Sequence, residues 1–118
     1  MLFRSHQWLY FLENLSNTIS ARQLEDLDKV FSFTTTTNNE ILAVWLRLAI
    51  RTRYMPAYAR LEQFLMEVGR RKYLEPLYKE LAKTPEGQTL ANEIYARARP
   101  RYHAISQGTV DGILGWQS

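Results

Sequence analysis

The chain has 118 residues, of which 15 are basic and 12 acidic, and its formal net charge is +3. This length suits one domain over residues 1–118, and an apolar fraction of 46% argues against a disordered chain. The small excess of basic residues is spread along the chain, which argues against nucleic-acid binding, and the absence of cysteine excludes disulfides and thiolate metal sites.

The N-terminal third of the sequence predicts two helices. Apolar residues at helical spacing, from Trp8 to Leu15, indicate a first helix with Ser5 as its N-cap. The segment Ser20–Gln23 matches a capping box, in which the cap side chain and the side chain three residues later each bond a backbone N–H. It therefore predicts the start of a second helix, whose apolar face begins with Leu24.

The middle of the chain predicts a linker and a central helix. The threonine-rich segment 34–39 is expected to be a connector, because Thr37 and Glu40 match a second capping box. The helix from Glu40 to about Arg53 is apolar on most sides and is therefore expected at the centre of the fold. Arg47 interrupts this apolar run, and we expect it to pair with an acidic group.

The next segment predicts two helices separated by a short cationic connector. A fourth helix opens at Pro56 and ends at Gly69, which is expected in the left-handed conformation that closes helices. A fifth helix is predicted from Pro76, in its first turn, to about Lys83. The connector then presents the three cations of Arg70–Lys72.

The last third predicts a sixth helix that is capped by Thr84 and Pro85 and ends at Pro100. A short final helix is expected from His103 to Val110, followed by an irregular tail. Helices of this length joined by short turns form antiparallel hairpins. We therefore predict an all-α fold in which such hairpins form a short armadillo- or HEAT-like α-solenoid, with a globular helical bundle as the alternative.

The sequence predicts no catalytic residue and no bound metal in this chain. Its two histidines, His6 and His103, lie almost a chain length apart, and no H-E-x-x-H or G-x-S-x-G motif occurs. Surface or capping roles are expected for both. The most apolar run, residues 41–50, is too short to span a bilayer, so no membrane association is expected.

Two clusters of basic residues have alternative interpretations. The cations of Arg70–Lys72 either complement the negative end of the preceding helix or bind an anion, since an arginine fork can grip a carboxylate and a lysine adds a point charge. Arg97, Arg99 and Arg101 flank Pro100 and are interpreted as a solvated helix end.

Three segments carry a resemblance to a known family: F-L-M-E-V-G-R-R-K-Y-L-E-P-L-Y-K-E-L at 64–81, N-N-E at 38–40 and W-L-R-L at 45–48. They resemble the C-terminal helical domain of leukotriene A4 hydrolase and aminopeptidase B, which are zinc aminopeptidases. The resemblance implies that the zinc lies in a separate, preceding catalytic domain. It implies that this chain forms one wall of the peptide-binding cleft, with Arg70 and Lys72 binding the substrate carboxylate.

The resemblance also sets the expected partners, which are the catalytic domain of the same enzyme and a peptide substrate, in a cytoplasmic protein. The chain alone is then not an enzyme. A different class of function stays open at this point, namely a freestanding helical adaptor whose concave face binds a partner protein. Nucleic-acid binding is a third and weaker alternative.

Overall fold

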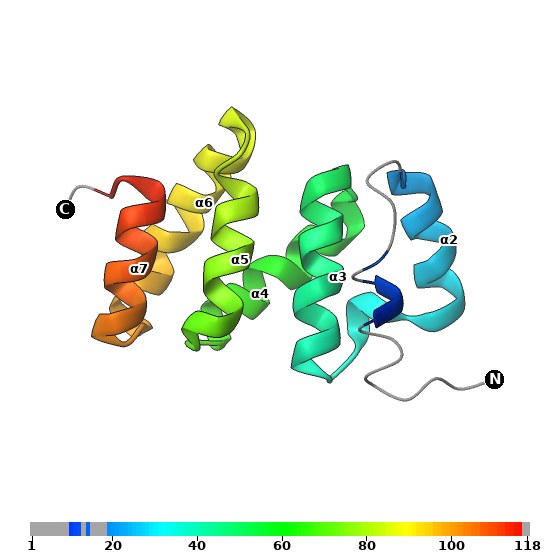
Figure 1. Ribbon diagram of the computed structural model, residues 1–118, viewed down its shortest axis with the longest axis horizontal. Coiled ribbons are helices and arrows are strands. Elements are labelled where there is room, and N and C mark those ends of the chain that lie inside the picture. The colour runs from blue at the N-terminus through cyan, green and yellow to red at the C-terminus, as the bar shows by residue number, and fades with distance from the viewer. Residues whose placement is uncertain (1–9, 13, 15–18, 117–118) are drawn as a thin grey trace. The chain divides into compact units, whose positions relative to one another are not determined.

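A computed structural model describes residues 10–12, 14 and 19–116 (Figure 1). All regular structure in these residues is helical, which confirms the all-α prediction. The backbone divides into two compact units, Met1–Tyr58 and Ala59–Ser118, which are described in turn. None of the helices in the described ranges has the length and apolar character needed to cross a membrane. Ser5, Trp8 and Leu15, on which the predicted first helix depends, and His6 lie outside the described residues.

Besides the helical residues 10–12, the described part of the first unit contains two further α-helices and two single turns of 3-10 helix. The helices are α2, Ala21–Phe31, and α3, Asn39–Thr52. The 3-10 turns are η1, Phe33–Thr35, between them, and η2, Met55–Ala57, after α3. The threonine-rich segment is therefore a helical turn with short connections rather than a strand, as predicted.

Local capping signals explain where α2 and α3 begin. At α2 the predicted capping box is present, with the Gln23 N–H donating to Ser20 Oγ at 3.3 Å and the Ser20 N–H donating to Gln23 Oε1 at 2.8 Å. The cap predicted for α3, Thr37, is wrong. The N-cap is Asn38, whose single side-chain oxygen accepts from the backbone N–H of both Glu40 and Ile41.

A polar contact network fixes the linker over the core of this unit. Trp45 is fully buried, and its indole N–H donates to Thr34 Oγ1 at 3.0 Å. The Asp28 carboxylate accepts from the Thr34 backbone N–H and hydroxyl and from the Tyr54 hydroxyl. Burial and this bond to Asp28 raise the pKa of Tyr54 to about 12. Arg47 on α3 is exposed, and its expected pairing with an acidic group stays a prediction.

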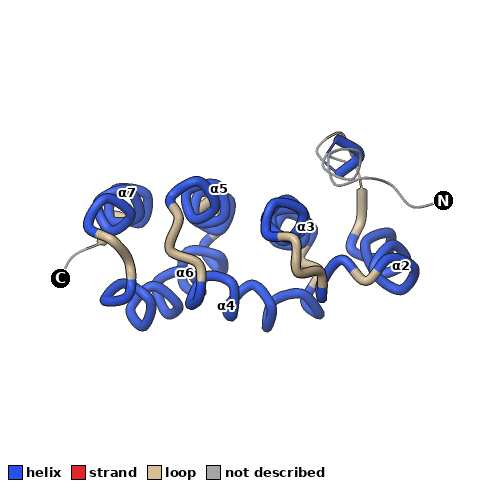
Figure 2. The backbone as a smooth tube through the Cα atoms, turned by 90° about the horizontal axis from the view of Figure 1, so that it is seen from below, coloured by secondary structure: helices blue, strands red, loops and turns tan. Residues whose placement is uncertain are grey.

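The second unit is a set of paired helices. Its helices are α4, Tyr58–Glu67, α5, Arg71–Leu81, α6, Pro85–Ala98, and α7, Ala104–Leu114. The first residue of α4, Tyr58, still belongs to the first unit. A 3-10 turn, η3, Arg99–Arg101, follows α6. Helices α5 and α7 lie side by side, and α6 runs in the opposite direction to both (Figures 1 and 2). This unit thus contains helical hairpins, whereas the solenoid arrangement of the whole chain stays a prediction.

The boundary between α4 and α5 differs from the prediction. Gly69 is not left-handed, and Pro76 lies inside α5 rather than in its first turn. A proline here removes a backbone donor and disfavours the helix. Packing overrides this penalty, because extending α5 back to Arg71 buries Tyr73 and Leu74 on the same helix face as the later core residues. These later residues are Leu77, Tyr78 and Leu81.

The start and end of α6 agree with the prediction, whereas α7 is longer. Thr84 is the N-cap of α6, and the helix ends at Ala98, just before Pro100. The final helix continues four residues beyond the predicted end at Val110, to Leu114. It ends at Gly115, whose φ of +62° is the left-handed conformation that glycine adopts at low cost.

Candidate functional site

The cationic cluster Arg70–Lys72 spans the last residue of the connector and the first turn of α5. Arg70 is the N-cap of α5, and Arg71 and Lys72 are its first two helical residues. All three side chains are exposed. The prediction of a connector is wrong for Arg71 and Lys72, because α5 starts at Arg71, five residues earlier than the proline signal indicated.

This position changes the electrostatics of the cluster. The start of a helix carries a partial positive charge and favours acidic residues, while cations are unfavourable there. The first turn of α5 contains no acidic residue, and the Arg70 side chain makes no capping hydrogen bond. The cluster therefore does not stabilise its own helix through the dipole. It instead adds side-chain positive charge to the helix end at which backbone N–H groups already favour anions.

Tyr73 orders two of the three cations. The guanidinium carbon of Arg70 lies 5.8 Å from the centre of the Tyr73 ring, and Lys72 Nζ lies 5.5 Å from it. Both distances are in the range of cation–π attraction. Tyr73 is itself buried and makes an edge contact with the ring of Phe64, with 5.9 Å between centroids. A fixed aromatic ring thus brings Arg70 and Lys72 to one place on the surface.

Arg71 faces a different environment. The pKa of the Glu75 carboxyl, one turn further along α5, lies below its ordinary value. The main cause is the hydrogen bond that Lys79 donates to Glu75 at 2.8 Å, and the positive charge of Arg71 contributes in the same direction. Arg71 therefore acts along the helix surface, which separates it from the pair that contacts Tyr73.

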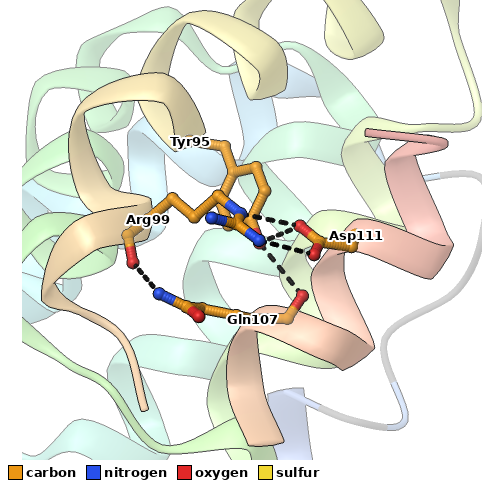
Figure 3. A network of polar contacts seen from close by, with 4 residues as sticks. All are labelled: Tyr95, Arg99, Gln107 and Asp111. Carbon is orange, nitrogen blue, oxygen red and sulfur yellow. Dashed lines mark hydrogen bonds and ion pairs between the residues drawn. The ribbon is translucent and has the colours of Figure 1, made fainter. Parts of the chain in front are cut away.

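The structure also contains a polar network that joins α6 to α7 (Figure 3). Arg99 donates from two guanidinium nitrogens to the two carboxylate oxygens of Asp111, at 3.0 and 2.9 Å. The Tyr95 hydroxyl lies 2.5 Å from Asp111 Oδ1 and 3.0 Å from the carbonyl oxygen of Gln107. The Gln107 amide in turn donates to the Arg99 carbonyl at 2.7 Å. Together these bonds fix the position of α7 against the end of α6.

This network shifts the pKa values of its members in directions that favour the ion pair. The hydrogen bonds from Arg99 and then Tyr95 hold the pKa of Asp111 below its ordinary value. Burial and the bond to Asp111 raise the pKa of Tyr95. The interpretation of Arg97, Arg99 and Arg101 as a solvated helix end is wrong for Arg99, and Arg97 forms an ion pair with Glu62 on α4.

Catalytic groups were not predicted for this chain. His103 is exposed and occupies the N-cap position of α7, without a capping bond from its side chain. Within residues 10–12, 14 and 19–116, no group of three or more histidine, cysteine or acidic side chains is placed to hold a metal ion. The cationic pair on Tyr73 is therefore the feature of the described chain with the clearest ligand chemistry.

Comparison with known proteins places this site in a family. Residues 3–114 match the family model described as leukotriene A4 hydrolase, C-terminal. The chain belongs to this family. Among similar proteins, leucine aminopeptidase 2 of Neurospora crassa is 29% identical over 113 residues, which cover 93% of this chain and 17% of that protein. The proteins of the same name from Chaetomium globosum and Yarrowia lipolytica are each 26% identical, over 93% and 95% of this chain and 18% of theirs.

The chain thus spans less than a fifth of the length of these relatives. In this leukotriene A4 hydrolase C-terminal domain, the sequence-predicted ligands Arg70 and Lys72 converge on one ring, and their role as carboxylate ligands stays a prediction. The network around Asp111 has no signal in the sequence, because Arg99 lies in the 3-10 turn after α6 and Asp111 lies on the next helix, α7. Their spacing of 12 residues has no helical periodicity to reveal the pair.

Proposed function

We propose that this chain is the C-terminal domain of a zinc aminopeptidase, where it forms one wall of the peptide-binding cleft. In this proposal Arg70 and Lys72 bind the free carboxylate of the peptide. The observation that carries the proposal is the shared contact of both cations with the buried Tyr73 ring at the start of α5. Family membership and the greater length of the aminopeptidase relatives support the same assignment.

The chemistry of the pair suits a carboxylate. The planar guanidinium of Arg70 can donate two parallel hydrogen bonds to the two carboxylate oxygens, and Lys72 adds a mobile point charge. The partial positive charge at the start of α5 adds to this attraction. Holding one end of the peptide in this way aligns the distant scissile bond, and an error of 1 Å in such alignment can lower turnover by about 100-fold.

The catalytic zinc belongs, in this proposal, to another domain of the same enzyme. The residues that the structure describes do not fit a zinc site, because they contain no suitable group of three ligands. We therefore assign no zinc and no bond-breaking step to this chain. Its proposed partners are the catalytic domain and the peptide substrate.

Peptide kinetics of the intact enzyme would test this role. We expect Arg70→Ala to lower kcat/KM by about 100-fold for a tripeptide with a free carboxylate, through loss of alignment. The loss should be much smaller for the same tripeptide with a C-terminal amide, and bound zinc should be unchanged. Arg71→Ala is the matched control, because it removes an adjacent exposed cation that acts on Glu75. Near-normal kinetics of Arg70→Ala would exclude the carboxylate role.

The size of the native protein separates this proposal from a freestanding adaptor. An immunoblot of a cell extract with an antibody to this domain should detect a band several times heavier than 13.9 kDa. A native product of 13.9 kDa would contradict the aminopeptidase assignment and favour a freestanding helical protein that binds a partner.

A further inference from the structure

Two side-chain hydroxyls hold the segment that leads to the cationic pair. Ser106, on α7, donates to the carbonyl oxygen of Gly69 at 2.9 Å, immediately before Arg70. Tyr102 donates to the carbonyl oxygen of Leu65 at 2.5 Å, in the last turn of α4. Both donors are buried, with 3% of Ser106 and 6% of Tyr102 exposed. The backbone before the site is therefore held by residues that follow it by more than thirty positions.

One of these bonds, from Tyr102 to Leu65, satisfies a carbonyl in the last turn of α4, whereas Gly69 lies beyond the helix end at Glu67. The last carbonyls of a helix have no helical partner, and a left-handed glycine commonly turns the chain so that later N–H groups reach them. Gly69 is not left-handed, so that solution is absent at the end of α4. Burial raises the pKa of Tyr102 to about 12, so its hydroxyl stays protonated as a donor at neutral pH. The path of the backbone into Arg70 consequently depends on the hydroxyl donors of Tyr102 and Ser106.

The donor on α7 is itself held in place. Ser106 precedes Gln107, whose amide bonds the Arg99 carbonyl, and the same helix carries Asp111, which is paired with Arg99. Helix α7 also packs along α5, whose first residue follows Arg70 (Figure 2). The hydroxyl of Ser106 is therefore a fixed point from which the Gly69–Arg70 peptide group is oriented.

We propose that Ser106 is a positioning residue of the anion site, which sets the direction in which Arg70 leaves the backbone. This inference rests on the proposed function of Arg70 as the carboxylate ligand. Ser106 does not contact the ligand and acts through the Gly69 carbonyl. Its loss lets the peptide group rotate and moves the guanidinium away from the alignment that the carboxylate requires, while the Tyr73 ring stays in place.

The test compares a tripeptide acid with its C-terminal amide in the intact enzyme that carries Ser106→Ala. We expect kcat/KM to fall by about tenfold for the acid, since part of the alignment is lost, and by less than twofold for the amide. Ser106→Cys keeps the shape and weakens the donor, so its acid preference should fall between those of serine and alanine. Thr89→Ala is the control, because it removes an exposed hydroxyl that bonds the Pro85 carbonyl within α6.

The kinetics of these variants decide between the possible roles of Ser106. Equal losses of kcat/KM on acid and amide would overturn the inference and leave Ser106 with a structural role only. Unchanged kinetics on both substrates would also overturn it. Arg70→Ala measured with the same substrates separates the two proposals. If Arg70→Ala discriminates acid from amide and Ser106→Ala does not, the positioning role is wrong and the carboxylate site stands. If neither variant discriminates, the proposed function itself is wrong.

Discussion

Two helices of the second unit begin in opposite ways. At the start of α6, Thr84 Oγ1 accepts from the Gly87 N–H at 3.0 Å, Pro85 occupies the first turn, and Glu86 places a negative charge there. At the start of α5, the N-cap Arg70 makes no capping bond and the first turn contains no acidic residue. The first arrangement follows each rule for a stable helix start, and the second breaks them.

The difference shows where this unit gives up local stability. Natural chains depart from local rules mainly at functional sites, where other contacts compensate. The contacts that compensate at α5 are the burial of Tyr73 and the hydroxyls of Tyr102 and Ser106 on the preceding carbonyls. Helix α6 needs no such support. The contrast favours stability as the role of the Thr84 cap and ligand binding as the role of the α5 start.

The largest expected effect is at Gly87. A Cβ atom at this position would overlap the backbone carbonyl oxygen of Leu81 and crowd Thr84 Oγ1. Because the obstructing oxygen belongs to the backbone, it cannot swing aside, and Gly87→Ala should destabilise the protein by about 3 kcal/mol. Urea unfolding monitored by circular dichroism measures this. A loss below about 0.5 kcal/mol would mean that the turn between α5 and α6 is less tightly packed than the structure indicates.

The next effect concerns the cap of α6. Thr84→Ala removes the acceptor for the Gly87 N–H, and we expect a loss of about 1 kcal/mol of unfolding free energy. Kinetics on acid and amide peptides should be unchanged in the intact enzyme, since Thr84 lies beyond the end of α5 that is opposite to Arg70. A loss of kcat/KM on the peptide acid alone would mean that the start of α6 also affects ligand binding. This would contradict the assignment of a purely stabilising role to the Thr84 cap.

Introducing an N-cap at the start of α5 should increase the unfolding free energy, whereas removing the Thr84 cap lowers it. Arg70→Asp supplies a side-chain acceptor and a negative charge at the helix start, worth about 1 kcal/mol, and removes the contact with Tyr73, worth about 0.5 kcal/mol. The net expectation is a gain of about 0.5 kcal/mol in unfolding free energy, together with loss of activity on peptide acids. Unfolding and kinetic measurements on one variant would check both signs. A destabilised Arg70→Asp would mean that the α5 start is already optimal for stability.

The elements that the sequence predicts correctly are those with complete local signals. The cap at Ser20 and the cap at Thr84 each satisfy their backbone donors within four residues, so the sequence pattern alone is sufficient. The all-α class follows in the same way from helical periodicity along the chain. The cluster Arg70–Lys72 is evident in the sequence, although its place at the start of α5 is not, and the ligand role of Arg70 and Lys72 stays a prediction.

The signals that failed are strong local ones that distant residues override. Gly69 follows the end of α4 as predicted but lacks the left-handed conformation, and the burial of Tyr73 extends α5 back beyond Pro76, which is therefore not in its first turn. The Ser106 hydroxyl that bonds the Gly69 carbonyl cannot be identified before the fold is known, because it lies 37 residues from Gly69. The bidentate pair of Arg99 and Asp111 was missed for the same reason.

The smallest predicted effect tests the backbone conformation of Gly69, which is not left-handed. With no left-handed backbone and no atom within 4 Å of an added Cβ, Gly69→Ala should gain about 0.4 kcal/mol, because alanine restricts the unfolded chain. Gly115→Ala is the matched control. That glycine also has an open Cβ position but a φ of +62°, so alanine should cost about 1 kcal/mol there. If both variants lose about 1 kcal/mol in urea unfolding, Gly69 is left-handed after all. If only Gly115→Ala does, α4 ends without a left-handed glycine, and the bond from the Tyr102 hydroxyl to the Leu65 carbonyl supports its last turn instead.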